Sequence, residues 1–73
     1  MIKRRFTVVI EKDEDGIYVA SVPELPGCHT QANHLDELDN RIKEAIKLYL
    51  EVVDDREYTG NSFIGIHEVE VAI

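Results

Sequence analysis

Residues 17–32 read IYVASVPELPGCHTQA, and this stretch predicts two short strands joined by a rigid loop. The first part, residues 17–22, is rich in β-branched and aromatic side chains, which favour an extended chain. Pro23 and Pro26 follow, and because proline lacks the N–H that a sheet ladder needs, the strand ends before them. Residues 28–32 then predict a second short strand, so the chain turns back on itself here.

The residues before this stretch predict another strand and a hairpin turn. Residues 5–11, RFTVVIE, alternate so that Phe6, Val8 and Ile10 share one face. Residues 13–16, DEDG, are a turn signal whose glycine can supply a positive φ. The strands on either side of this turn therefore form an antiparallel hairpin.

The residues after the quoted stretch predict one long helix over 34–54. Apolar residues recur there at three- and four-residue intervals, which gives one stripe along a helix. They are Leu35, Leu38, Ile42, Ala45, Ile46, Tyr49, Val52 and Val53. Glu37 with Arg41 and Asp39 with Lys43 are favourable pairs on the exposed side of this helix.

The last part of the chain predicts a loop and a fourth strand. Residues 54–65 contain two glycines and few periodic apolar residues, which is typical of a loop. Residues 66–73, IHEVEVAI, alternate again, with His67 and the valines on one face and the glutamates on the other.

These elements predict an α+β fold with the order β-β-β-α-β, in one domain over residues 1–73. The third strand, the helix and the fourth strand form a crossover that should be right-handed. The fourth strand then pairs in parallel beside the first, which gives a four-stranded sheet in the order 3-2-1-4. One long helix covers one face of this sheet, by analogy with a minimal ribonuclease-H-like sheet. The covered face is expected to hold Phe6, Val8, Ile10, Tyr18, Ala20, Val22, Val69 and Val71.

The opposite face of the expected sheet has no helix and carries Val9, Ile17 and Val19 beside Thr7 and Ser21. An open apolar patch on a small protein usually marks an interaction site. A chain this short also has a thin core and benefits from a partner chain. We therefore expect a homodimer or higher oligomer that uses this face or a sheet edge. The alternative is that an antiparallel sheet tolerates a solvated face with scattered apolar residues.

The amino-acid composition limits the class of protein to which this chain can belong. Fifteen Asp and Glu residues against eight Lys and Arg residues give a net charge of −7. This charge opposes non-specific binding to nucleic acid and favours a partner with a positive surface, although solubility alone also explains it. Cys28 is the only cysteine, so no disulfide forms within the chain. No signal-peptide or membrane-spanning stretch is present, and these features together suggest the cytoplasm.

The sequence offers no catalytic or metal-binding pattern. Cys28 and His29 are neighbours in a strand, so their side chains point to opposite faces and do not form a nucleophile–base pair. The cysteine and histidines lack the spacing of a structural zinc site. A ribonuclease-H-type enzyme needs carboxylates on its central strands, whereas the strand at 5–11 has an acid only at its end. We expect no enzyme activity, no cofactor and no metal, and the basic run at 3–5 is weak evidence for nucleic-acid contact.

The segments discussed above also resemble a known family. Residues 18–31, YVASVPELPGCHTQ, followed by Leu35 and by residues 43–51, KEAIKLYLE, are similar to the pattern of HicB antitoxins. The resemblance implies a small α/β fold without catalysis of its own. It also implies a partner, the HicA toxin, which is a small basic ribonuclease with a catalytic histidine. Antitoxins of this family cover that active site.

This chain departs from the family pattern at several positions. Ala32 stands where the family usually has Gly, and His34 stands where it usually has Ser or Thr. Asn33 is then the best candidate to cap the helix. Many members carry a helix-turn-helix or ribbon-helix-helix domain that binds the operator. Here the sequence stops at Ile73, so we expect no C-terminal DNA-binding domain and no direct nucleic-acid binding by this chain alone.

The function expected from these arguments is that of an antitoxin-like module that occludes the active site of a HicA-type toxin. The candidates for partner contact are Glu24 and Leu25 in the proline-bounded loop and Glu68 and Glu70 in the last strand. Two alternatives stay open. One is a solitary binding or scaffold module without a toxin partner, and the other is a small-ligand sensor on the open sheet face.

Overall fold

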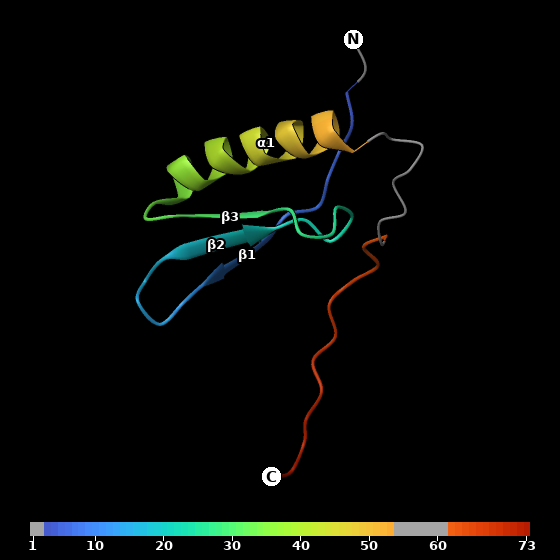
Figure 1. Ribbon diagram of the computed structural model, residues 1–73. Helices are drawn as coiled ribbons and strands as arrows, with labels where there is room; N and C mark the ends of the chain where they lie inside the picture. The colour runs from blue at the N-terminus through green and yellow to red at the C-terminus, as the bar shows by residue number, and fades with distance from the viewer. Residues whose placement is uncertain (1–2, 54–61) are drawn as a thin grey trace.

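The computed structural model describes residues 3–53 and 62–73, and it contains one sheet and one helix. The strands are β1 (Val9–Lys12), β2 (Tyr18–Ser21) and β3 (His29–Ala32). They form an antiparallel sheet in the order β1-β2-β3. The helix α1 (Leu35–Val52) follows and lies across one face of this sheet (Figure 1).

Glycine and aspartate shape the two turns between the strands. Gly16 and Gly27 both have a φ of 83°, in the left-handed region that other residues rarely adopt, and the turn signal at 13–16 had indicated this for Gly16. In the β1–β2 turn, one carboxylate oxygen of Asp13 accepts hydrogen bonds of 2.9 Å from the backbone N–H groups of Asp15 and Ile17. Asp13 therefore stabilises the hairpin turn from within.

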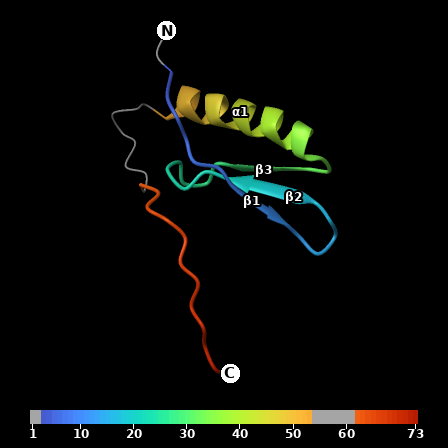
Figure 2. The same ribbon diagram turned by 180° about the vertical axis from the view of Figure 1, so that it is seen from behind.

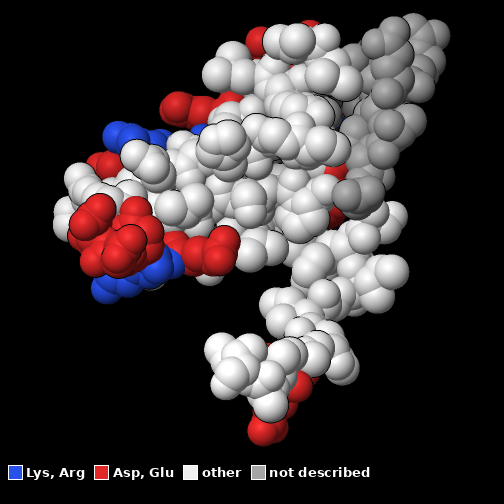
Figure 3. Space-filling model, turned by 60° about the horizontal axis from the view of Figure 1, so that its bottom comes forward, with Lys and Arg blue, Asp and Glu red and all other residues white. Residues whose placement is uncertain are grey.

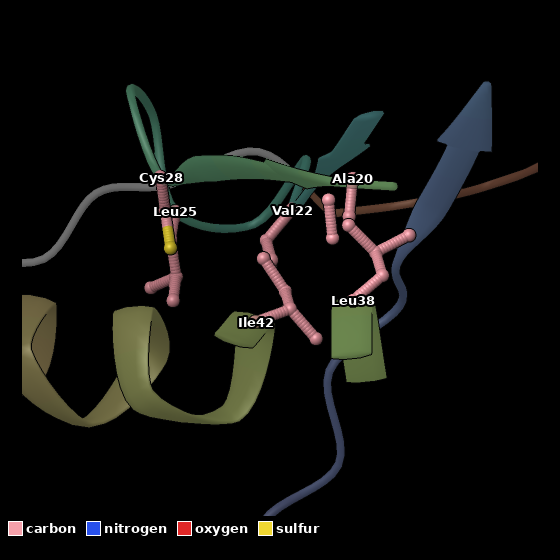
Figure 4. Packing of buried hydrophobic residues seen from close by; sticks show 7 residues of the cluster. Ala20, Val22, Leu25, Cys28, Leu38 and Ile42 are labelled. Atoms are coloured by element: carbon pink, nitrogen blue, oxygen red, sulfur yellow. The ribbon is translucent and has the colours of Figure 1, made fainter. Parts of the chain in front are cut away.

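The core lies between the sheet and α1, as Figure 4 shows. Its buried members are Ala20, Val22, Leu25, Cys28, Ala32, Leu38 and Ile42. Phe6, Val8 and Tyr18 pack against them from the partly buried rim. The expected helix-covered face is therefore found for Phe6, Val8, Tyr18, Ala20 and Val22, but Ile10, which was also expected there, is 55% exposed. The large side chains that are fully buried are Leu25 and Leu38, so much of the core rests on these two residues.

The helix begins later than its sequence pattern predicts. His34 is its N-cap residue and makes no capping hydrogen bond through its side chain, so the expectation that Asn33 caps the helix is wrong. Both expected ion pairs form, Glu37 with Arg41 at 3.2 Å and Asp39 with Lys43 at 3.0 Å.

The helix is also longer than the sheet that it covers. Two apolar residues at its ends, Leu35 and Val52, are therefore 51% and 85% exposed. Arg41 ties the helix to the sheet because it donates a 2.9 Å hydrogen bond to the backbone carbonyl of Gln31, in β3.

The predicted four-stranded sheet in the order 3-2-1-4 is wrong, because the sheet has three strands. Residues 66–73 form no strand in the structure, and every residue from 62 to 73 is exposed. Figures 1 and 2 show this segment leading away from the sheet. Val69 and Val71, which were expected in the core, are 71% and 69% exposed. The expected loop at 54–65 lies partly outside the described residues, which omit 54–61.

The missing fourth strand has a physical reason. The alternation of apolar and polar residues in 66–73 indicates that the segment can form a strand, but it does not specify which strand it pairs with. Ile10 shows the consequence, since without a strand beside β1 its side chain is 55% exposed. β1 is also shorter than the predicted strand at 5–11. At Thr7, the backbone N–H donates to the carboxylate of Glu24 and so makes no ladder bond.

Candidate protein-interaction surface

The loop from Pro23 to Gly27 is a compact turn whose two candidate contact residues have different environments. Backbone hydrogen bonds from Leu25 N–H to the Val22 carbonyl (3.0 Å) and from Cys28 N–H to the Leu25 carbonyl (2.9 Å) fold it tightly. Leu25 is fully buried in the core (Figure 4). The structure thus places Leu25 inside the molecule, where it anchors the loop.

Glu24 lies half-buried on the outside of the same loop. Its two carboxylate oxygens lie 3.2 and 3.1 Å from the backbone nitrogen of Thr7, which donates to them. This bond fastens the N-terminal segment to the loop across a separation of 17 residues. The remaining lone pairs of the carboxylate are available for a further donor.

The sheet face opposite α1 has a mixed character. Val9, Ile17 and Val19 are half-buried there. The strand register places Val9 opposite Ser21, and it places Val19 between Glu11 and Gln31. Viewed from this side in Figure 3, the central surface is largely free of charged side chains. The three apolar residues therefore form an interrupted patch rather than a continuous one.

Two groups of acidic side chains lie away from this patch. The β1–β2 turn carries three exposed acids, Asp13, Glu14 and Asp15, and Figure 3 shows acidic side chains gathered at this end of the molecule. Glu68 and Glu70 are exposed on the extended C-terminal segment. The loop residue Glu24 and these two glutamates thus belong to separate parts of the surface.

A groove along the outer side of β1 was missed by the sequence analysis. Phe6, Val8 and Ile10 line it from one side, and Ile42, Ile46 and Leu50 of α1 line it from the other. Its larger part has a volume of about 500 Å³ and its smaller part about 270 Å³. The signal was the apolar alternation of residues 6–10, but the expected fourth strand filled the same space. Its lining is more apolar than polar, although the charged residues Arg4, Asp39, Lys43 and Lys47 also contribute to it, and no described element of the fold covers it.

The residues with reactive side chains do not gather into a site. Within residues 3–53 and 62–73, no three side chains of the metal-binding types lie close enough together to hold a metal ion. Cys28 is 6% exposed and points into the core, whereas His29 is exposed on the other face. One ring nitrogen of His29, Nδ1, lies 3.0 Å from the carbonyl oxygen of Gly27.

Burial raises the pKa of the Cys28 thiol above its ordinary value of 9.0, because the thiolate loses solvation in the core. The unfolded chain therefore releases this proton at a lower pH than the folded protein does. We expect stability to be unaffected by this group below about pH 9 and to fall as the pH rises towards the raised pKa. Urea unfolding of wild type and Cys28→Ala across this range measures the effect. The alkaline fall should be smaller in Cys28→Ala, and parallel profiles would contradict it.

The fold and the surface together define a small acidic α+β domain, in which one helix packs on a three-stranded antiparallel sheet. Residues 6–70 match the sequence model of the HicB-like antitoxins of bacterial toxin–antitoxin systems. The chain therefore belongs to the HicB-like antitoxin family, which confirms the resemblance noted from its loop and helix.

Three relatives of known sequence have nearly the same length as this chain. A UPF0150 protein of Archaeoglobus fulgidus is 63% identical over 67 residues, which cover 92% of this chain and 94% of the relative. A UPF0150 protein of Synechocystis sp. is 48% identical over 71 residues, covering 97% of this chain and all of the relative. One from Thermotoga maritima is 37% identical over 96% of this chain and 93% of its own length.

Within the described residues, no helix combines the length and the apolar character that crossing a bilayer requires.

Proposed function

We propose that this protein is an antitoxin that binds a HicA-type ribonuclease toxin in the cytoplasm and blocks its active site. The observation that carries the proposal is the match of residues 6–70 to the HicB-like antitoxin family. The net charge of −7 supports it, because a ribonuclease that binds RNA needs a positive surface and an acidic protein is attracted to such a surface. The antitoxin acts by occlusion and needs no catalysis of its own.

The contact residues that we propose are the acids Glu24, Glu68 and Glu70. Glu24 is held in place by the Thr7 backbone N–H, so a partner cation would meet a carboxylate that is already oriented. The other two glutamates are exposed on a segment that leads away from the sheet, where a partner can reach them (Figure 1). Leu25 contributes indirectly in this proposal, because its burial holds the loop that presents Glu24.

We further propose that the protein acts as a single domain over residues 1–73 and as a homo-oligomer, by default a dimer. Val9, Ile17 and Val19 on the helix-free face are candidate contact residues because they are apolar and half-exposed, and a sheet edge is the alternative contact. An oligomer would give a thin core the additional support that small domains need.

Co-expression tests the proposed partnership. The chain, carrying an affinity tag, is produced together with an untagged HicA-type toxin whose catalytic histidine has been replaced, so that the host survives. We expect the toxin to be retained with the chain through a wash at physiological salt and to be released at high salt, since charge contributes to the contact. Failure to retain any toxin encoded beside this gene would favour the solitary binding module instead.

A further inference from the structure

The apolar groove along β1 and the extended C-terminal segment have complementary properties. The groove, lined by Phe6, Val8 and Ile10 of the N-terminal part and by residues of α1, lies beside the free edge of β1. The segment 66–73 presents apolar side chains on alternate residues, and its described residues are all exposed. Exposed apolar strands beside an open sheet edge are unfavourable in water and tend to pair.

The backbone of β1 has hydrogen-bonding groups directed outward at this edge. Thr7 N–H donates to Glu24, which follows β2, and Asp13 N–H donates to the Ile17 carbonyl at 2.9 Å. The odd-numbered residues of this stretch thus direct their amides towards β2. Since successive residues of a strand alternate, Val8 and Ile10 direct their N–H and C=O groups away from the sheet. A further strand can therefore add to this edge.

We propose that the C-terminal segment of a second copy of this chain occupies that edge and groove, and that two copies exchange their segments reciprocally. In the structure each chain's own segment leads away from its sheet (Figures 1 and 2), so both the strand and its acceptor site are open on the same molecule. A two-fold symmetric dimer covers the C-terminal segment and the groove of each chain at once, whereas a different partner would cover one of them and leave the other exposed. This inference concerns assembly and goes beyond the proposed toxin binding.

The length of the C-terminal segment and the charges around the groove are compatible with this pairing. Eight residues of extended chain span roughly 26 Å, enough to run beside residues 4–10 and into β1. If the valines of the segment face the groove, Glu68 and Glu70 point to the opposite face of the sheet. Arg4, Phe6 and Val8 line the groove, and Lys3 and Arg5 are exposed. When the added strand extends β1 over residues 3–8, Lys3 and Arg5 alternate onto that same opposite face. Two chains that each carry a net charge of −7 thus meet where acids face bases.

Two variants test the C-terminal strand and its acceptor groove separately. Val69→Lys/Val71→Lys places charge on the groove-facing side of the segment, and Ile10→Lys places it in the groove. Both changes fall on side chains that are more than half exposed, so the fold of each chain should persist, as circular dichroism can verify. Leu48→Lys, at a helix position that is 62% exposed and does not line the groove, is the matched control.

Sedimentation equilibrium of the full chain at micromolar concentration, without toxin, is the measurement. We expect wild type and Leu48→Lys to be dimers and each groove or segment variant to dissociate, with a dissociation constant raised on the order of a hundredfold. An equal mixture of the two variants should regain dimer, because the intact segment of one fits the intact groove of the other.

Three results would overturn the proposal. They are a monomeric wild type, a segment variant that stays dimeric, and a mixture that stays monomeric. Dissociation by Val19→Lys with no effect of the segment variant would assign the dimer to the helix-free face instead. Because toxin is absent, none of these outcomes bears on the proposed antitoxin function.

Discussion

Leu38→Ala is expected to lower the free energy of unfolding by about 2–5 kcal/mol, a large part of what a domain this small possesses. Leu38 is 1% exposed and packs in the core between the first turn of α1 and the sheet (Figure 4). Its removal leaves a cavity between α1 and the sheet that the surrounding structure can fill only in part. Urea unfolding followed by circular dichroism, at one fixed protein concentration, measures the loss.

Leu48→Ala provides the matched control for this core substitution. It makes the same chemical change on the same helix, but at a side chain that is 62% exposed. Leucine and alanine have similar helix propensities, so the control should change stability by less than about 0.5 kcal/mol. Equal effects of the two substitutions would mean that Leu38 is not a core residue.

Glu68→Lys/Glu70→Lys is expected to weaken inhibition of a HicA-type toxin by roughly thirtyfold or more. Reversing charges at a contact with a basic partner replaces attraction by repulsion, and losing one member of a charge pair that becomes buried in an interface typically costs about 2–5 kcal/mol. The substitution should leave the fold intact because both side chains are exposed on a segment outside the core. The measurement is the antitoxin concentration needed to halve RNA cleavage.

Glu44→Lys/Glu51→Lys is the control for overall charge. It changes the net charge by the same amount at two exposed positions of α1. If non-specific attraction explained inhibition, both variants would lose it equally, and the specific role of the C-terminal glutamates would be disproved. The oligomeric state of each variant is measured in parallel, since Glu68 and Glu70 also adjoin the proposed dimer contact.

The local elements could be predicted from the sequence because each has a local cause. The helix follows from its apolar periodicity, and the positive φ of Gly16 and Gly27 follows from turn chemistry. The face of β2 that meets the helix follows from alternation, which places Ala20 in the core. These features depend on residues a few positions apart.

The position of residues 66–73 could not be predicted because it depends on which edge is available and on which chain supplies the strand. Their alternation is real, but no local signal distinguishes pairing within a chain from pairing between chains. The burial of Leu25, a residue of the candidate site, could not be predicted from the sequence either. Its place between two prolines suggested an exposed tip, whereas the hydrogen bonds of the loop turn its side chain inward. Glu24 remains a candidate for partner contact, and its bond to Thr7 joins residues too distant in sequence to foresee.

The most direct test of the antitoxin function is a titration of active HicA-type toxin with this protein while cleavage of a messenger RNA is followed. If the chain works by occluding the active site, cleavage should fall linearly with added protein and stop when the toxin sites are filled, at a fixed stoichiometric ratio. The chain alone should leave the RNA intact throughout. Undiminished cleavage in the presence of excess folded protein, with toxins encoded beside this gene or its relatives, would contradict the account.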